Sequence, residues 1–236
     1  MPLTLAATPL GNPKDASARL IEAIATAEII AAEDSRRFHR LASDLGVTFT
    51  GKVLSFFEGN EDARTNEIMD HLRAGTKVLV VTDAGMPSIS DPGFRLTRDA
   101  IAENIAISVL PGPSAVTTAI TLSGLPTDRF SFDGFPPRTG GARKKFFDEL
   151  RHEERTMVFF EAPHRLAESL ADAVASFGGD RPSAICREMT KHYEETIRGT
   201  LLQLHEWAVN NEVLGEITLV ISGAANDSAS ITTDAM

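Results

Sequence analysis

The stretch Val78–Phe94, which reads VLVVTDAGMPSISDPGF, constrains the fold of this chain more than any other segment. It begins with a run of apolar and β-branched residues, which is typical of a short strand buried on both faces of a parallel sheet. A polar loop rich in glycine and proline follows, and Phe94–Ile101 then has helical spacing. We expect Asp91 to cap that helix and Pro92 to be its first residue.

The polar residues just after this strand are candidates for a ligand site. In an open parallel sheet, ligands bind in the loops beyond the carboxyl ends of the strands. Asp83 can accept hydrogen bonds from a hydroxyl or an amine, and Gly85 lets a ligand approach the backbone closely. An ordinary strand-to-helix turn, with glycine and proline as breakers, explains the same residues equally well.

The order of strand, loop and helix recurs along the chain and indicates the α/β class. Strands of a parallel sheet are expected at 3–7, 28–32, 53–57, 78–82 and 105–110. Later strands, at 129–135, 156–160, 183–186 and 217–221, begin with a polar and apolar alternation that is typical of a mixed sheet. We predict a Rossmann-like N-terminal α/β domain over 1–112, a mixed α/β domain over 113–223 and a disordered tail over 224–236.

Composition excludes several classes of protein. The 236 residues are 42% hydrophobic and 24% charged, which is typical of a globular chain. No apolar run approaches the roughly 20 residues of a membrane-spanning helix. The N-terminus lacks the basic segment of a secretory signal, and Cys186 is the only cysteine, so we expect a cytoplasmic protein without disulfides. The histidines show no metal-ligand spacing, and we expect no metal site.

The net charge of −10 disfavours non-specific binding to nucleic acid, but two local basic runs depart from this balance. One is Arg36–Arg40, with the sequence RRFHR, and the other is 138–145, where no acid separates the four cations. Taken alone, each run is better explained by a solvated surface. Glu33 and Asp34, just before the first run, either face a ligand or cap a helix.

Seven motifs, in order along the chain, carry a resemblance to a known family. They are ATPLGN at 7–12, AEDSR at 32–36, TDAGMP at 82–87 with SDPG at 90–93, LPGPSA at 110–115, FEAPHR at 160–165, REMTK at 187–191 and GE at 215–216. With this set the chain resembles the tetrapyrrole-methylase superfamily of S-adenosylmethionine-dependent methyltransferases. It is most similar to the ribosomal branch, whose members 2′-O-methylate a cytidine in small-subunit (16S) ribosomal RNA. Ser35, Phe57, Met86 and Ala162 depart from the residues common in that branch.

The resemblance implies a tetrapyrrole-methylase-like fold, a homodimer, and S-adenosylmethionine bound between the two domains. It implies that the cofactor contacts come from Leu10, Asp83, Gly85, Met86, Pro87, Ser114, Ala115, Phe160, Glu161 and Ile217. The expected partner is ribosomal RNA within the small subunit. With this family in view, we expect RNA to bind at Arg36, Arg37, Arg40, Arg143, Lys144 and Lys145.

Methylation of a ribose 2′-hydroxyl needs a general base or a nearby cation, since a protonated hydroxyl is a poor nucleophile. Glu188 and Lys191 are the candidates, because both follow an expected strand in a polar cluster. A lysine acts as a base only if its pKa is lowered; otherwise it stabilises negative charge on the oxygen. A phosphate contact or a surface ion pair explains Lys191 equally well.

Two other functions stay open. One is methylation of a porphyrin or corrin precursor, although that branch usually has a glycine-richer loop at Thr8–Asn12. The other is a non-catalytic, cofactor-binding role in ribosome assembly, which no sequence feature excludes.

Overall fold

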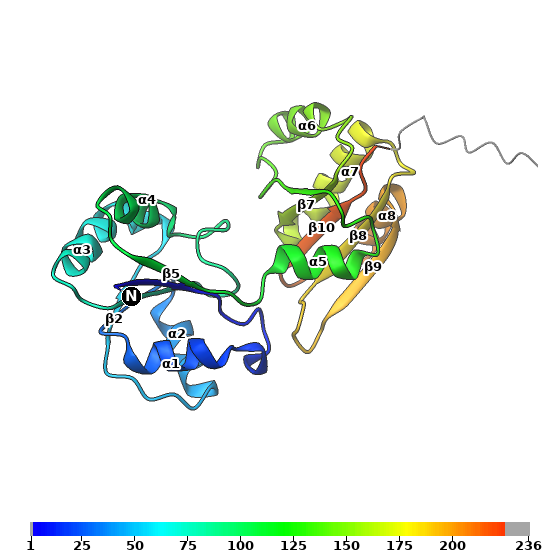
Figure 1. Cartoon of the computed structure of the whole chain (residues 1–236). Coiled ribbons are helices and arrows are strands. Elements are labelled where there is room, and N and C mark those ends of the chain that lie inside the picture. Colours follow the sequence, from blue (N-terminus) through cyan, green and yellow to red (C-terminus); the bar gives the residue numbers. More distant parts are fainter. Residues whose placement is uncertain (1, 225–236) are drawn as a thin grey trace, which may run out of the picture. The chain divides into compact units, whose positions relative to one another are not determined.

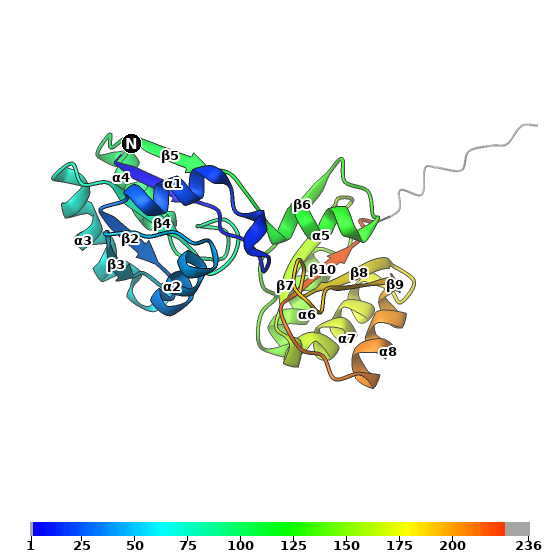
Figure 2. The same cartoon turned by 90° about the horizontal axis from the view of Figure 1, so that it is seen from below.

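The computed structural model describes residues 2–224, so the predicted disordered tail lies outside the described residues except for its first residue, Ala224. The chain divides into two compact units between Ala115 and Val116 (Figures 1 and 2). We call them the first unit and the second unit. No helix among the described residues is long and apolar enough to cross a membrane.

The first unit contains a five-stranded sheet in which every pairing is parallel, as predicted. The strand order is β3-β2-β4-β1-β5. The strands are β1 (Leu3–Ala6), β2 (Ile29–Ala32), β3 (Lys52–Ser55), β4 (Val78–Val81) and β5 (Ile107–Leu110). All residues of the central strand β4 are buried, which explains its uniformly apolar sequence.

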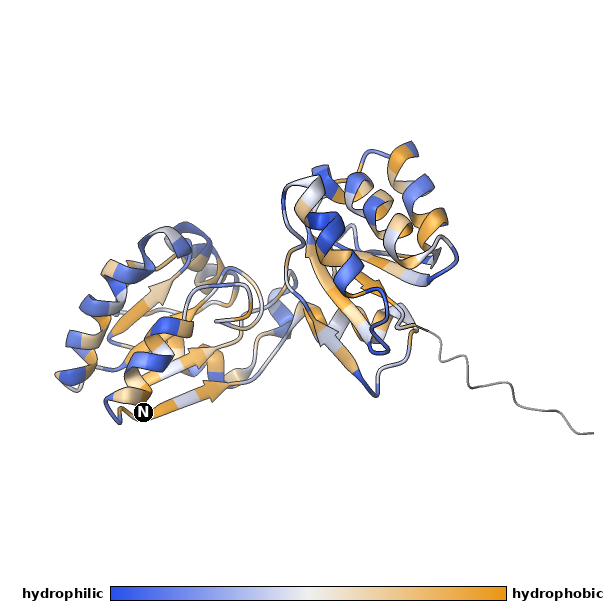
Figure 3. Cartoon of the chain, turned by 90° about the horizontal axis from the view of Figure 1, so that it is seen from above, coloured by the Kyte–Doolittle hydropathy of each residue, from blue (hydrophilic) through white to orange (hydrophobic). Residues whose placement is uncertain are grey.

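Helices cover both faces of this sheet (Figure 1). The helices α1 (Ala18–Thr26) and α2 (Ser35–Asp44) lie on one face, and α3 (Glu61–Arg73) and α4 (Phe94–Ala102) lie on the other. Successive strand side chains point to opposite faces, so Val80 packs under α3 and α4 whereas Val81 packs under α1 and α2. Figure 3 shows the resulting pattern of apolar strands and helices with a polar face.

The predicted start of α4 is wrong. Gly93, with φ of 132°, is the N-cap residue, rather than Asp91. The amide of Ser88 donates a hydrogen bond to the carbonyl of Pro92 at 3.2 Å, so Pro92 closes a turn instead of opening the helix. The glycine is needed because few other residues adopt so positive a φ.

The second unit contains a mixed five-stranded sheet, which confirms the predicted class. Its order is β6-β7-β10-β8-β9, and only the pair β6·β7 is parallel. The strands are β6 (Phe130–Phe132), β7 (Thr156–Glu161), β8 (Pro182–Arg187), β9 (Glu195–Thr200) and β10 (Ile217–Ile221). One face packs on α6 (Gly140–Glu149), α7 (Leu166–Phe177) and α8 (Leu201–Asn210). On the other face, Cys186 Sγ donates to the carbonyl of Ala119 in α5 (Ala115–Ser123) at 3.6 Å.

Strand β9 was not predicted from the sequence. Its residues, ETIRGT, include two charges and a glycine, and none of them is buried. The strand forms because it pairs with the edge of β8, with Cys186 opposite Thr196. The hairpin that results carries the loop 188–194, which contains Lys191, beyond the strands of the sheet (Figure 1).

Candidate active site

Three loops at the carboxyl edge of the first sheet are held together by backbone contacts. The amide of Thr8, after β1, donates to Gly85 O at 2.9 Å, and the amide of Gly85, after β4, donates to Thr8 O at 3.1 Å. Thr8 Oγ1 also donates to the carbonyl of Thr82 at 3.0 Å. A Cβ atom at Gly112, after β5, would lie only 2.9 Å from Ala7 Cβ. The glycines of the sequence motifs therefore serve the close approach of these loops.

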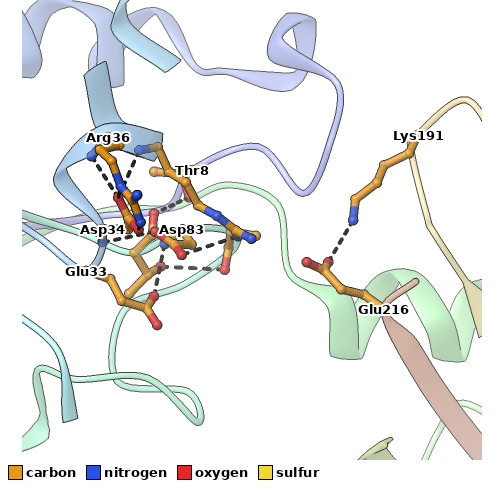
Figure 4. A network of polar contacts seen from close by, with 10 residues as sticks. Thr8, Glu33, Asp34, Arg36, Asp83, Lys191 and Glu216 are labelled. Atoms are coloured by element: carbon orange, nitrogen blue, oxygen red, sulfur yellow. Dashed lines mark hydrogen bonds and ion pairs between the residues drawn. The ribbon is translucent and has the colours of Figure 1, made fainter. Parts of the chain in front are cut away.

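The loops after β2 and β4 exchange carboxylate-to-amide hydrogen bonds, which we call the Glu33–Asp83 clamp (Figure 4). The amide of Asp34 donates to Asp83 Oδ1 at 3.1 Å, and the amide of Asp83 donates to Glu33 Oε2 at 3.1 Å. Arg37 Nη1 lies 3.2 Å from Asp83 Oδ2. The Asp83 carboxylate, expected to contact a cofactor, therefore already fixes its own loop to α2.

The two acids of the second loop have different roles. Asp34 caps α2, since its Oδ1 accepts from the amides of Arg36 and Arg37 at 2.7 and 3.2 Å. The hydrogen bond from the Arg36 guanidinium, together with those amides, lowers the pKa of Asp34 to about 2. Burial raises the pKa of Glu33, and the negative charges of Asp83 and Asp34 add to this effect. The capping explanation thus holds for Asp34, while Glu33 belongs to the clamp.

The groups at this edge of the first unit fit a nucleoside-type cofactor. Leu10 and Pro87 are buried apolar side chains, and Met86 is half-buried. Gly85 has φ of 82°, and a Cβ there would lie 3.5 Å from Leu10 Cδ2. Backbone amides and carbonyls beside apolar side chains suit a ligand that is part ring and part polar. The donor set therefore fits S-adenosylmethionine.

In the second unit, two of the expected cofactor residues turn their side chains inward. The Glu161 carboxylate is buried and accepts hydrogen bonds from the amide of Ala162 and from Ser169 Oγ. It also lies 3.3 Å from Arg165 Nε. Ile217 packs into the core under α6, α7 and α8. Both residues stay predicted cofactor contacts, and their backbone groups are the atoms that these side-chain contacts leave available.

Phe160, at the same end of β7, is half-buried and belongs to an aromatic cluster. Its ring centroid lies 4.8 Å from that of Phe132 and 5.5 Å from that of Phe135. Phe135 is 53% exposed, so this cluster presents an aromatic surface to solvent. Ser114 and Ala115 are half-buried at the end of the first unit, where α5 begins.

Lys191 is held between two carboxylates, Glu188 and Glu216, of which Figure 4 shows Glu216. Its Nζ lies 2.9 Å from Glu188 Oε1 and 3.0 Å from Glu216 Oε2. The amide of Glu216 donates to Glu188 Oε1 at 2.9 Å, which fixes the first carboxylate in turn. A Cβ atom at Gly215, which has φ of 90°, would clash with the Glu188 side chain. The motif GE at 215–216 is therefore required by the same cluster.

The charges of this cluster determine the pKa of Lys191 and of Glu188. Burial alone would lower the pKa of Lys191, but the hydrogen bonds and negative charges of Glu188 and Glu216 outweigh it, so that the pKa is raised. Burial opposes ionisation of Glu188, yet the amide of Glu216 and the Lys191 ammonium hold the pKa of Glu188 below its ordinary value. The cluster therefore favours the charged form of Lys191 at neutral pH, which is the fixed cation rather than the base.

The basic runs are less uniform than their sequences indicate. The expectation that Arg143 binds RNA is wrong, because its side chain is only 3% exposed and its Nε lies 2.7 Å from Asp172 Oδ2. Arg37 is exposed but belongs to the clamp. The remaining cations of the two runs, Arg36, Arg40, Arg138, Lys144 and Lys145, face solvent, and Lys144 makes no ion pair with any residue between 2 and 224.

Sequence reasoning missed residues that hold the candidates in place. Ser169 and Asp172 lie on α7 and contact Glu161 and Arg143. They follow the FEAPHR motif by several residues and have no distinctive spacing. Glu216 was part of a quoted motif, and its position after a glycine was the only signal for it.

A large cavity of the second unit lies away from these candidates. It has a volume of about 690 Å³ and is lined by residues such as Thr156, Pro182 and Ser222, which lie at the opposite ends of β7, β8 and β10 from Glu161, Arg187 and Ile217. No candidate residue lines it. Size alone therefore does not identify the active site here.

The sequence matches a known family over residues 2–205, the Tetrapyrrole (Corrin/Porphyrin) Methylases. The chain belongs to this family. The fold of a tetrapyrrole methylase is also found in solved structures of uroporphyrin-III-C-methyltransferase from Thermus thermophilus. One has a TM-score of 0.67 at 16% identity and covers 93% of both chains. Another, complexed with S-adenyl homocysteine, has a TM-score of 0.62 at 15% identity, covering 93% of this chain and 96% of the other.

Relatives within the tetrapyrrole methylases are more similar in sequence. The chain is 53% identical over 223 residues to ribosomal RNA small subunit methyltransferase I of Mycobacterium tuberculosis, covering 94% of this chain and 78% of the relative. It is 41% identical over 221 residues to the protein of the same name from Thermotoga maritima, covering 94% of this chain and 98% of the relative.

The Lys191 cluster leads to a prediction about titration. In Glu188→Gln the pKa of Lys191 should fall, because a negative charge that offsets the effect of burial is removed. Nuclear magnetic resonance of ¹³C-labelled lysine side chains measures this pKa directly. Glu194→Gln is the matched control, since the Lys191 ammonium contacts Glu188 and Glu216 but not Glu194. A wild-type Lys191 that titrates below the ordinary lysine value would contradict the assignment of a fixed cation.

Proposed function

We propose that this chain is an S-adenosylmethionine-dependent methyltransferase that modifies the ribose 2′-hydroxyl of a cytidine in small-subunit (16S) ribosomal RNA. The observation that carries the proposal is the 53% identity, over 94% of the chain, to a ribosomal RNA small subunit methyltransferase I. The Lys191 cluster supports the chemistry, because it offers a fixed cation to an oxygen nucleophile.

The cofactor, when bound, supplies an electrophilic methyl group. The residues proposed to hold it are Leu10, Asp83, Gly85, Met86, Pro87, Ser114, Ala115, Phe160, Glu161 and Ile217. Asp83, Glu161 and Ile217 would act through the backbone or by fixing their loops, because their side chains are already engaged. The other members offer apolar side chains and backbone groups, except for Ser114, whose side chain is a hydroxyl.

Lys191 and Glu188 are proposed to have different roles at the substrate hydroxyl. The Lys191 ammonium donates toward the 2′-oxygen and stabilises the negative charge that develops there. Glu188 holds the ammonium in place and keeps it charged. The hydroxyl becomes more acidic as its oxygen bonds to carbon, so its proton passes to a carboxylate or to water late in the step.

Ribosomal RNA is the proposed partner, and the exposed cations of the two basic runs are the residues proposed to bind it. Arg36, Arg40, Lys144 and Lys145 present charge to solvent and would contact phosphate groups.

Phe94 and Ile101 are 66% and 63% exposed and lie seven residues apart on α4, which places them on one helix face. The exposure of these apolar side chains supports a homodimer, in which a second copy of the chain would cover this face. A cytoplasmic location, where ribosomal subunits form, is consistent with these features.

Methyl transfer from labelled S-adenosylmethionine tests the proposed reaction. The acceptors are undermethylated small ribosomal subunits, naked ribosomal RNA and a porphyrinoid, compared side by side. We expect label in the subunit RNA that resists alkali, since a 2′-O-methyl group blocks cleavage of the neighbouring phosphodiester. Label in the porphyrinoid alone would overturn the substrate, and cofactor binding without any transfer would favour a non-catalytic role.

The role of Lys191 predicts a loss of turnover. Lys191→Ala should lower kcat by about 10²- to 10³-fold, the usual effect of removing one group that stabilises an oxyanion. Cofactor affinity, measured by calorimetry, should stay unchanged. Lys77→Ala is the matched control, because Lys77 is exposed at the start of β4, away from the carboxyl edge. Turnover in Lys191→Ala equal to that of the wild type would remove the ammonium from the chemistry.

The exposed cations predict a specific salt dependence. Replacing Arg36 and Arg40 by glutamine should reduce the slope of log affinity against log salt by about 0.7 to 0.9 for each phosphate group that is no longer neutralised. Filter binding to small subunits over a range of salt concentrations measures this slope. The same replacement at Arg73 and Arg95, which are also exposed on helices of the first unit, should leave it unchanged. Equal slopes in both double variants would show that α2 does not bind the phosphate backbone.

A further inference from the structure

The loop that carries Lys191 also presents an aromatic pair to solvent. Tyr193 is 69% exposed, and it is the only tyrosine of the chain. Its ring lies against His192, with centroids 4.7 Å apart and an interplanar angle of 74°. The edge-on contact leaves a face of the tyrosine ring open.

This loop is held in one conformation by its own hydrogen bonds. The amide of Lys191 donates to Glu188 O at 3.0 Å, and the amide of Glu194 donates to Lys191 O at 3.2 Å. The Glu194 carboxylate accepts from the amide of Thr190. Glu188 and Thr190 have φ of 49° and 66°, which few residues adopt outside a fixed turn. Tyr193 is therefore displayed on an ordered backbone, which reduces the entropic cost of binding a ligand.

The charges around the loop favour one kind of ligand. The acids exceed the cations here, since the loop and the residues paired with it include Glu188, Glu194, Glu195 and Glu216 against Arg187 and Lys191. The Arg187 guanidinium is paired with Glu195 at 2.8 Å, and Lys191 is paired with two carboxylates. An acidic surface repels phosphate groups, so the loop is a poor site for an RNA backbone. An uncharged, flat nucleobase does not meet this repulsion.

We propose that Tyr193 is a stacking platform for an unpaired base of the RNA substrate, next to the nucleotide that is methylated. This inference rests on the proposed function. Proteins commonly recognise single-stranded RNA by stacking splayed bases on aromatic side chains. Tyr193 follows Lys191 by two residues, so their Cα atoms are at most about 7 Å apart. Successive stacked bases are about 3.4 Å apart, so a base beside the reacting ribose lies within reach of Tyr193.

Variants at this position separate stacking from other contacts. With S-adenosylhomocysteine present, Tyr193→Ala should weaken binding to undermethylated small subunits by about 5- to 150-fold, the range for removing one stacked base. Tyr193→Leu should weaken it similarly, because it keeps apolar surface but has no aromatic face. Tyr193→Phe and Tyr193→Trp should bind as the wild type does. The salt slope should be the same in all five proteins, because none of these replacements changes a charge.

Methyl transfer is measured in parallel, so that the two hypotheses fail separately. Equal binding by the wild type and Tyr193→Ala overturns the stacking inference, whether or not methyl groups are transferred. Absence of transfer by a wild type that binds subunits overturns the proposed function alone. Phe130→Ala, which removes an exposed aromatic ring from β6, is the matched control and should bind normally. A thermal unfolding curve for each variant verifies that it is folded.

Discussion

The burial of β4 on both faces is the constraint on which the carboxyl edge of the first sheet depends. Because Val80 and Val81 pack into cores on opposite faces, the strand cannot slide or rotate without exposing one of them. Thr82 and Asp83 must then emerge at a fixed point between the ends of β1 and β2. The clamp with Glu33 and the bridge to Thr8 follow from that position.

Carboxylates have two different structural roles in this chain. Asp83 and Glu161 satisfy backbone amides and arginines inside their own units, and they hold loops in place. Glu188 and Glu216 instead surround an ammonium and keep it charged. The same side-chain chemistry thus gives rigidity at one place and a fixed positive charge at another. The difference lies in whether the partner is an interior donor or a lysine on a projecting loop.

The net charge of −10 and a proposed RNA substrate are compatible because charge is distributed unevenly. Exposed cations on α2 and α6 suit phosphate groups, while the acidic loop that bears Lys191 suits the uncharged parts of a nucleotide. This uneven distribution of charge would direct the phosphate backbone of the RNA and its bases to different surfaces of the protein.

The sequence by itself determined the α/β class, both sheets, most strand positions and the family, since periodicity and motif order depend on local composition. It also identified the strand-end loops as candidates. Only the tertiary structure decided which side chains remain available, because burial and pairing depend on residues distant in sequence. Arg143 turned inward to Asp172, and β9 formed without a strand pattern because β8 offered an edge. Lys191 became a fixed cation because Glu216, far along the chain, lies beside it.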